Sequence, residues 1–309
     1  MARGSEWSAQ DFAKELRKIR RRCDDLTFGA SELRDDIYRV VVRCAICKSV
    51  DFAILTSKRH RYAGTDYAMI GGIRGICEDL IMLSYIKRFD SEDRNRLIML
   101  IQTMNFRAGV AAQASFFSSN NPFQPVIGGD KDKATLEGDV RSAKAELSAF
   151  WKAKGVARQG GPTVREMAED LNIQSVYNYV YFLSSNFVHF NTHALLRNGW
   201  GDPEGPFRYR IGNFDGYYKS LSVFCSALLV IGFCYAFADV FVAGSPEEEV
   251  NALLLVISEV HRWPEIVTFE ELNKDPPLFV FSHALRKVAV EGGEAIPYGG
   301  VVQEIKNLR

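Results

Sequence analysis

Apolar residues recur at steps of three and four over most of the chain, which is the pattern of amphipathic helices. The first stretch follows a cap-type residue at Ser8, and its inward positions are Phe12, Leu16, Ile19, Cys23 and Leu26. The same criterion predicts further helices over residues 31–55, 66–88, 91–116, 134–154, 175–198 and 245–263, and another from about residue 215. The sequence therefore predicts an all-α protein, built as a multi-helix bundle.

Weaker signals lie between these helices. The run Thr163–Glu166 has the residue types of a capping box and predicts a short helix. Tyr209 and Ile211 alternate with arginines, which predicts at most one short extended segment, over residues 207–212. Short helices are expected at residues 268–273 and 278–290, and a surface loop at 118–133.

The second predicted helix contains two of the six cysteines. Its inward face is expected to carry Leu33, Ile37, Val41, Cys44 and Phe52. Cys44 and Cys47 form a CxxC motif, but no second such pair occurs, as a zinc ribbon would require. The context of a thioredoxin active site is also missing, so both thiols are expected to be reduced and to pack in the core.

Length and composition favour one ordered domain. The chain has 309 residues, of which 47% are hydrophobic and 25% charged, so a packed core is expected. We predict a single helical domain over residues 1–290, with its core at about 30–263. Residues 291–309, which include several glycines, are predicted to be a flexible tail.

The charge balance limits the partners that the whole molecule can attract. With 38 basic and 38 acidic residues, the formal charge is zero and no long-range field draws the chain to nucleic acid or anionic lipid. Such a partner would need a local patch, and basic clusters at residues 17–22 and 58–61 are candidates for contacts with RNA phosphates. Basic runs are more often solvated helix faces.

One segment has the length and composition of a membrane span. Residues 220–238 contain no charged side chain. Three serines and a glycine interrupt the run, no second comparable segment occurs, and a central bundle helix is also apolar on all sides. We therefore favour a buried helix over a membrane span. The first residues have no apolar stretch of the secretory type, so a cytoplasmic location is expected.

The helix predicted over residues 175–198 carries two different rows of side chains. An apolar row suited to core packing consists of Val176, Val180, Leu183, Phe187, Phe190 and Ala194. A polar row beside it advances by four residues at each step and consists of Tyr177, Tyr181, Ser185, His189, His193 and Arg197. Polar groups next to a core stripe need hydrogen-bond partners from another helix.

The third predicted helix offers those partners, because Arg74 and Glu78 lie one turn apart in an otherwise apolar stretch. An unpaired charge near the core is costly. We therefore predict that the two helices pack together, with Arg74 or Glu78 within hydrogen-bond reach of His189 or Tyr181.

Four interpretations of this constellation remain open. The network can be purely structural and fix the register of the helices. His189 can act as a general base while Arg74 stabilises a phosphate, which suits ribonuclease chemistry. The pocket can also bind a small ligand or a partner protein without catalysis.

The fourth interpretation is a metal site formed by His189, His193 and Glu78, since two histidines four residues apart share one helix face. Arg74 competes for the Glu78 carboxylate, and its permanent positive charge repels a divalent ion. We therefore expect neither a metal nor another cofactor.

Several short motifs resemble a bacterial helical family catalogued as domain of unknown function 5677. They are RGICE at residues 74–78, Trp151, TVREMA at 163–168 and YFLSSNFVH at 181–189, and the resemblance covers about residues 30–240. Its typical polar positions correspond to Arg74, Glu78, Tyr181, Ser185 and His189.

The family is similar in turn to the HEPN helical bundles of prokaryotic toxin–antitoxin and phage-defence systems. Many HEPN proteins are ribonucleases that use an arginine and a histidine four to six residues apart. Here the position five residues before His189 is Ser184, so an arginine from the other helix, Arg74, would have to substitute.

This resemblance implies a HEPN-like bundle that acts on RNA through the pocket of Arg74, Glu78, Tyr181, Ser185 and His189. The alternative is a non-catalytic binding or scaffold module in which the same residues hold the helices together. RNA, a partner protein and a second copy of the chain are the partners left open.

Overall fold

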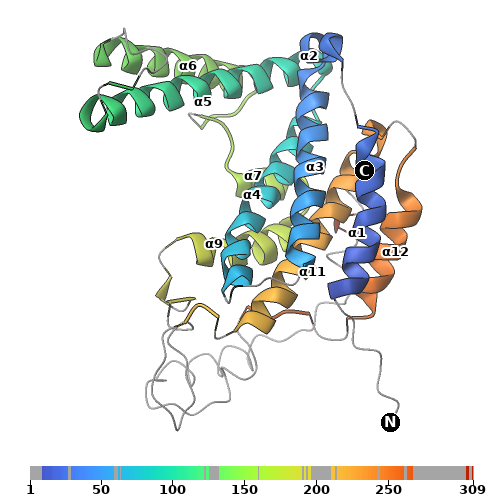
Figure 1. The fold of residues 1–309 in the computed structure, drawn as a ribbon. Coiled ribbons are helices and arrows are strands. Elements are labelled where there is room, and N and C mark those ends of the chain that lie inside the picture. The colour runs from blue at the N-terminus through green and yellow to red at the C-terminus, as the bar shows by residue number, and fades with distance from the viewer. Residues whose placement is uncertain are drawn as a thin grey trace, which may run out of the picture. The chain divides into compact units, whose positions relative to one another are not determined.

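Among the residues that the computed structural model (Figure 1) describes, every regular element is a helix, as predicted. It describes residues 9–26, 29–58, 62, 64–121, 123–124, 132–158, 160–189, 191–192, 194–195, 210–212, 214–241, 244–260, 263–266, 304–305 and 308. The chain divides into two compact units. Unit 1 comprises Met1–Thr27, Val42–Ser84 and Ala168–Arg309, and unit 2 comprises Phe28–Val41 and Tyr85–Met167. The boundaries of the single predicted domain remain a prediction.

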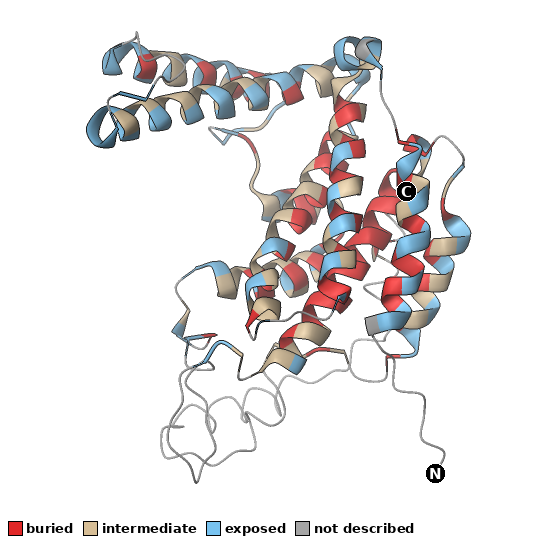
Figure 2. Cartoon of the chain, viewed as in Figure 1, coloured by how far each residue is buried: buried red, intermediate tan, exposed pale blue. Residues whose placement is uncertain are grey.

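Helix α11 (Asp215–Ala236) is the central helix of unit 1. Every residue from Leu221 to Ala236 is buried, and Figure 2 shows this burial along most of the helix. Its serine hydroxyl groups bond to the helix backbone or across the core, since Ser226 and Thr56 of α3 (Ile37–Ser57) share a hydrogen bond of 2.9 Å. A helix that is apolar on all sides is expected where neighbours cover every side.

Two further helices of unit 1 pack beside α11. They are α1 (Ala9–Asp24) and α12 (Glu247–Ser258), which also pack against each other. The predicted inward positions of α1 are buried, with Phe12, Leu16 and Ile19 fully enclosed. α12 starts near the predicted residue 245 and has three glutamates in its first turn, but it ends before the predicted residue 263.

By length and composition, α11 is also the one helix among the described residues that could cross a membrane. Its most apolar window has a mean hydropathy of 1.7, and 89% of that window is buried inside the protein. This burial agrees with the core-helix interpretation of residues 220–238. Length and composition of a single helix are weak evidence for a membrane span.

Helix α4 (Thr65–Ile86) packs closely against α11. A side chain placed on Gly232 of α11 would bring its Cβ to 2.7 Å from Cδ2 of Leu80, a fully buried residue of α4. Near the first turn of α4, the rings of Tyr67 and Tyr218 meet edge to face at 5.2 Å. Because these contacts place one face of α4 against α11, only its other faces can contact other elements.

Unit 2 is built around α5 (Ser91–Asn120) and α6 (Lys133–Ala153), which pack side by side (Figure 1). Both begin at an aspartate whose carboxylate accepts a backbone N–H, Asp90 from Asp93 at 2.9 Å and Asp132 from Thr135 at 2.7 Å. Burial on α6 is concentrated on one side of the helix and involves Leu136, Ala143, Leu147, Phe150 and Trp151.

The capping box predicted at Thr163 is present where the chain enters α7 (Val164–Asp170). The backbone N–H of Thr163 donates to Glu166 at 2.6 Å, and the N–H of Glu166 donates to the Thr163 hydroxyl at 3.2 Å. The bond from the Thr163 N–H lowers the pKa of Glu166, because it stabilises the carboxylate.

The second predicted helix is wrong in its continuity and in its inward face. It is split at Asp36 into α2 (Ala30–Asp35) and α3, because Asp36 has non-helical backbone angles and its carboxylate accepts the N–H of Arg39. The helical phase restarts there, so Leu33 and Cys44 are exposed. The fully buried positions are instead Val42, Ile46, Val50 and Ala53.

The structure tests only part of the predictions for the extended segment at 207–212 and for the C-terminal residues. Residues 210–212 form a turn and no strand, while 207–209 lie outside the described residues, as do both short helices predicted at 268–273 and 278–290. Within the predicted flexible tail, Ile305 is fully buried, and Glu304 accepts the backbone N–H of Ser175 at 3.0 Å. The chain is therefore anchored at these two tail residues.

Close packing at Gly232 makes a testable prediction. Alanine normally stabilises a helix by about 0.5–1 kcal/mol relative to glycine, but a methyl group at Gly232 would overlap Leu80. Gly232→Ala should lower the melting temperature. Gly216→Ala, in the same helix with nothing within 4 Å of its added methyl, should leave it unchanged or raise it. Thermal melts showing the same effect for both variants would contradict the packing of α11 on α4.

Candidate functional site

The candidate residues come from two segments of unit 1, which are α4 and the stretch from Tyr181 through α9 (Phe182–Val188) to His189. Ring contacts join them, because Phe187 of α9 meets Tyr67 of α4 at 5.3 Å and Tyr218 of α11 at 5.6 Å, both edge to face. A Cβ on Gly71 of α4 would lie 3.4 Å from a methyl group of Val188. The predicted packing of these two helices is confirmed.

The apolar side of α4 determines where Arg74 and Glu78 lie. Ile70, Ile73, Cys77 and Leu80 are fully buried, so the helix cannot rotate without exposing them. Arg74 and Glu78 then lie beside this face, with 21% and 35% of their side chains exposed. Arg74 donates from Nε to the Glu78 carboxylate at 3.1 Å, as the spacing of one turn predicts.

The other two guanidinium nitrogens of Arg74 reach the second chain segment. Nη2 donates to the Tyr181 hydroxyl at 2.9 Å, and Nη1 contacts Nε2 of His189. The guanidinium carbon also lies over the Tyr181 ring, 5.0 Å from its centroid. The geometric prediction is therefore confirmed for both Tyr181 and His189, with Arg74 as the common donor.

The protonation of Tyr181 depends on its burial and on the charges of Glu78 and Arg74 near it. Burial raises the pKa of Tyr181 above its ordinary value, and the nearby Glu78 carboxylate acts in the same direction, against the opposing charge of Arg74. Tyr181 therefore keeps its proton at neutral pH. Since Arg74 has only N–H donors, Nε2 of His189 is the acceptor in their contact.

The guanidinium of Arg74 keeps its positive charge. Burial of the guanidinium opposes its charge, but the hydrogen bond and carboxylate of Glu78, together with Tyr181, outweigh this effect and raise the pKa of Arg74. The site therefore holds a permanent cation beside an imidazole and a neutral phenol. Such a group can bind an anion, accept a proton at His189 and donate one from Tyr181.

The helix predicted over residues 175–198 is not continuous. It consists of a short α-turn (Gln174–Val176), a π-helical turn (Tyr177–Tyr181) and α9, which ends at Val188. Within the π-turn, the rings of Tyr177 and Tyr181 stack at 4.7 Å with an angle of 17° between their planes. This stack supports the face of Tyr181 and was not predicted, although π-turns are frequent at functional sites.

His189 lies just beyond the end of α9. Its backbone is extended (φ −100°, ψ 165°), while its N–H makes the last helical hydrogen bond, to the carbonyl of Ser185 at 3.0 Å. The expectation that His189 lies within the helix is therefore wrong. His193, Phe190 and Arg197 lie outside the described residues, and no group of three metal-ligating side chains lies together among those that are described.

Ser185 is the one candidate residue that makes no described contact with Arg74. Its hydroxyl donates to the backbone carbonyl of Tyr181 at 2.7 Å. Ser184 bonds in the same way to Val180 at 2.7 Å and is fully buried. Serine often satisfies its hydroxyl on the preceding turn of its own helix. The structure therefore brings together Arg74, Glu78, Tyr181 and His189, with Ser185 beneath Tyr181.

Comparison with known families gives one match. Residues 60–206 match the model described as Family of unknown function (DUF5677). This segment, here called the DUF5677 segment, is similar to that family. It contains all five candidate residues and is shorter than the range 30–240 expected from the sequence. Neither the curated proteins nor the solved structures gave a match.

Two cysteine thiols outside the DUF5677 segment form a second candidate site. Cys47 of α3 is half-buried and is hydrogen-bonded to Cys23 of α1, which is buried. The Cys23 thiol is the main cause that lowers the pKa of Cys47 to about 7, and the nearby Arg20 guanidinium adds to this effect. The expected core packing of the CxxC motif is thus wrong for Cys44, which is exposed, and Cys47 is paired with a thiol 24 positions earlier.

The pH dependence of alkylation tests this pair. In a Cys44→Ser background, iodoacetamide should modify Cys47 with a midpoint near pH 7, because only the thiolate reacts. Replacing the donor by Cys23→Ala should move this midpoint upward, toward the ordinary thiol value of 9.0. Peptide mapping by mass spectrometry gives the rate at each pH. A midpoint that does not move in Cys23→Ala would contradict the proposed cause.

Proposed function

We propose that this chain is an RNA-cleaving protein whose active site consists of Arg74, Tyr181 and His189. The observation that carries the proposal is that a single guanidinium binds both an imidazole and a phenol, at an accessible position. His189 is exposed, whereas Arg74 and Tyr181 are partly buried. A phosphodiester could therefore approach from the side of His189 while Arg74 and Tyr181 remain fixed.

The arrangement supplies the groups that transesterification of RNA requires. His189 would accept the proton of the ribose 2′-hydroxyl as its oxygen forms a bond to the adjacent phosphorus. The bond from phosphorus to the 5′-oxygen would break, and Tyr181 would donate its proton to that leaving oxygen. Arg74 would stabilise the negative charge on the non-bridging oxygens. The products are a 2′,3′-cyclic phosphate and a free 5′-hydroxyl.

Glu78 has a positioning role in this proposal. Its carboxylate fixes Nε of Arg74, so that the opposite edge of the guanidinium points to Tyr181 and His189. The arginine thus comes from α4, whereas the histidine follows the end of α9. Ser184, at the position five residues before His189, is fully buried and bonded to Val180, so it cannot replace this cation. The proposal places the chain with HEPN-like proteins, in a cytoplasmic toxin–antitoxin or phage-defence context.

The second candidate is a structural network in a binding or scaffold module. One observation favours it: all three nitrogens of the Arg74 guanidinium are already engaged by protein groups. Catalysis would require the substrate phosphate to share or displace one of these contacts. The His189 contact is the most exposed of the three and is the one a phosphate would displace. Variants that separate cleavage from stability decide between the two candidates.

Cleavage of a labelled single-stranded RNA tests the proposal. His189→Ala should lower the rate about 10²–10⁴-fold, since it removes the general base. Tyr181→Phe and Arg74→Ala should also lower the rate, and a cyclic phosphate should be found by mass spectrometry. Ser185→Ala is the matched control, because that hydroxyl bonds only to the helix backbone among its described contacts, and it should keep the wild-type rate.

The pH profile is a second readout of the same assay. Because the pKa of Tyr181 is raised, this acid stays protonated through neutral pH, and activity should fall only as pH rises above 10, its ordinary value. Wild-type protein that cleaves no RNA, while His189→Ala and Tyr181→Phe lower only the melting temperature, would reject cleavage and favour the structural network.

A further inference from the structure

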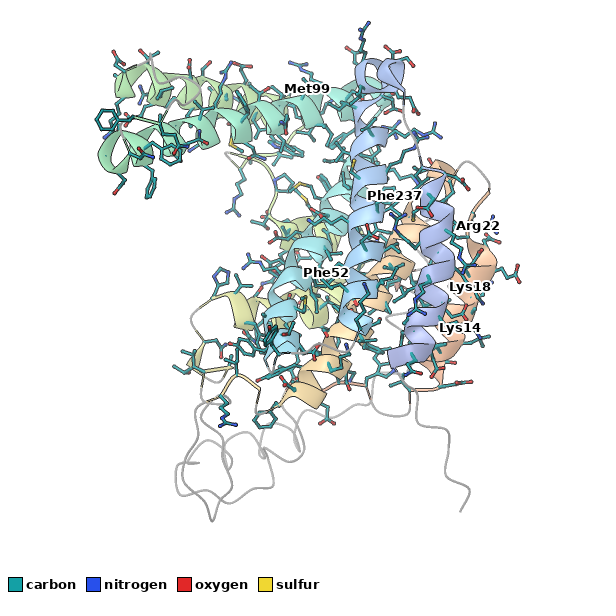
Figure 3. All side chains as sticks on the ribbon, in the orientation of Figure 1. Lys14, Lys18, Arg22, Phe52, Met99 and Phe237 are labelled. Carbon is teal, nitrogen blue, oxygen red and sulfur yellow. The ribbon has the colours of Figure 1, made fainter. Side chains whose placement is uncertain are left out.

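A row of basic side chains, here called the α1 ridge, lies on the exposed face of α1. It consists of Lys14, Arg17, Lys18 and Arg21, which are all exposed and follow the spacing of one helix face. Figure 3 shows Lys14 and Lys18 following one another along α1, on the side where α12 lies. The ridge extends over about 10 Å, at roughly 1.5 Å per helical residue.

Three of the four ridge cations have no acidic partner within the described part of the chain. These three are Lys14, Arg17 and Arg21, whereas Lys18 pairs with Glu15 at 2.8 Å. The chain has as many acidic as basic residues, so unpaired cations at this spacing are not a consequence of a general excess of charge. Two other arginines of α1 are used internally, Arg20 with Asp51 of α3 and Arg22 with Glu249 of α12.

Acidic side chains border the ridge on both sides. Asp51 of α3 accepts from Arg20 at 2.6 Å, and Glu249 of α12 accepts from Arg22 at 2.8 Å, with the exposed Glu248 next to it. These ion pairs hold α1 between α3 and α12 and limit the positive surface to a narrow strip. A narrow strip suits a linear polyanion, whereas a flat anionic surface would also meet the flanking carboxylates.

The burial of the apolar side of α1 excludes insertion of this helix into a membrane interface. Helices that lie in a membrane interface insert apolar side chains between the lipids. In α1 the corresponding residues, Phe12, Leu16 and Ile19, are fully buried in unit 1. The exposed side of α1 therefore offers polar and mostly basic side chains, which suit the sequence-independent electrostatic contact with a nucleic-acid backbone.

We propose that the α1 ridge binds the phosphodiester backbone of single-stranded RNA, through Lys14, Arg17, Lys18 and Arg21. The choice of RNA rests on the proposed function, while the ridge itself belongs to no part of the Arg74 site and lies outside the DUF5677 segment. The ridge would hold the polymer by charge without reading its sequence. It would thereby raise the local concentration of RNA around unit 1, which contains the Arg74 site.

The test measures binding separately from cleavage. Fluorescence anisotropy with a labelled 2′-O-methyl oligouridine, which lacks the attacking hydroxyl, gives the affinity of the full chain at several salt concentrations. The triple variant Lys14→Gln, Arg17→Gln, Arg21→Gln should bind at least about tenfold more weakly. Its slope of log affinity against log salt should be smaller by about 2, at roughly 0.7 for each lost phosphate contact.

A matched variant controls for the change in net charge. Lys133, Lys144 and Lys152 are exposed on α6, and replacing these three by glutamine removes the same charge from unit 2. This control should keep the wild-type affinity and salt slope. Equal losses in both triple variants, or no loss in either, would overturn the proposal, and thermal melts confirm that both variants are folded.

Two further outcomes are distinguishable. If the α1 variant loses binding to vesicles containing anionic lipid, while wild type does not bind the oligonucleotide, then the ridge is a lipid contact and the proposal is wrong. If ridge-dependent RNA binding is found but no RNA is ever cleaved, the inference stands and the proposed catalytic function fails.

Discussion

The guanidinium of Arg74 is the group on which the candidate site depends, because a partly buried permanent charge must be paired. One cation orients a carboxylate, a phenol and an imidazole from two separate parts of the sequence. Arginine can do this because its three nitrogens diverge in one plane, whereas a lysine would offer a single point of charge. Removing it would leave three polar groups without their common donor.

The core of unit 1 determines where that cation lies. α11 is buried on all sides, and Gly232 allows α4 to approach it closely at Leu80. The rings of Tyr67, Phe187 and Tyr218 then join α4, α9 and α11 near the site. Packing and the geometry of the candidate site are thus linked, since the burial of one face of α4 in the core leaves Arg74 beside Tyr181.

The sequence was sufficient to predict the helical class and the partners of Arg74. Apolar spacing identified α1, α4 and α11, and a polar row at steps of four identified Tyr181 and His189. Such spacing reports which residues share a face only where the helix is regular. It could not reveal the π-turn at residues 177–181, the break at Asp36 or the helix end at Val188, because local hydrogen bonds and ring stacking determine these.

The spacing of residues in the sequence also could not predict which side chains from different helices form pairs. Cys47 was predicted to pack in the core with Cys44, yet it contacts Cys23 of another helix. Likewise, the basic cluster of α1 was visible in the sequence, but not which of its members are used in ion pairs. The structure separates Arg20 and Arg22, which have acidic partners on neighbouring helices, from the exposed ridge.

A double-mutant cycle between Arg74 and Tyr181 tests the central claim most directly. The free energy of unfolding is measured by urea denaturation for wild type, Arg74→Ala, Tyr181→Phe and the double variant. If the 2.9 Å hydrogen bond organises the site, the two losses should be non-additive, with a coupling of about 0.5–3 kcal/mol. Arg74→Ala combined with Arg17→Ala should be additive to within about 0.5 kcal/mol. Additive losses for Arg74 and Tyr181 would contradict the account.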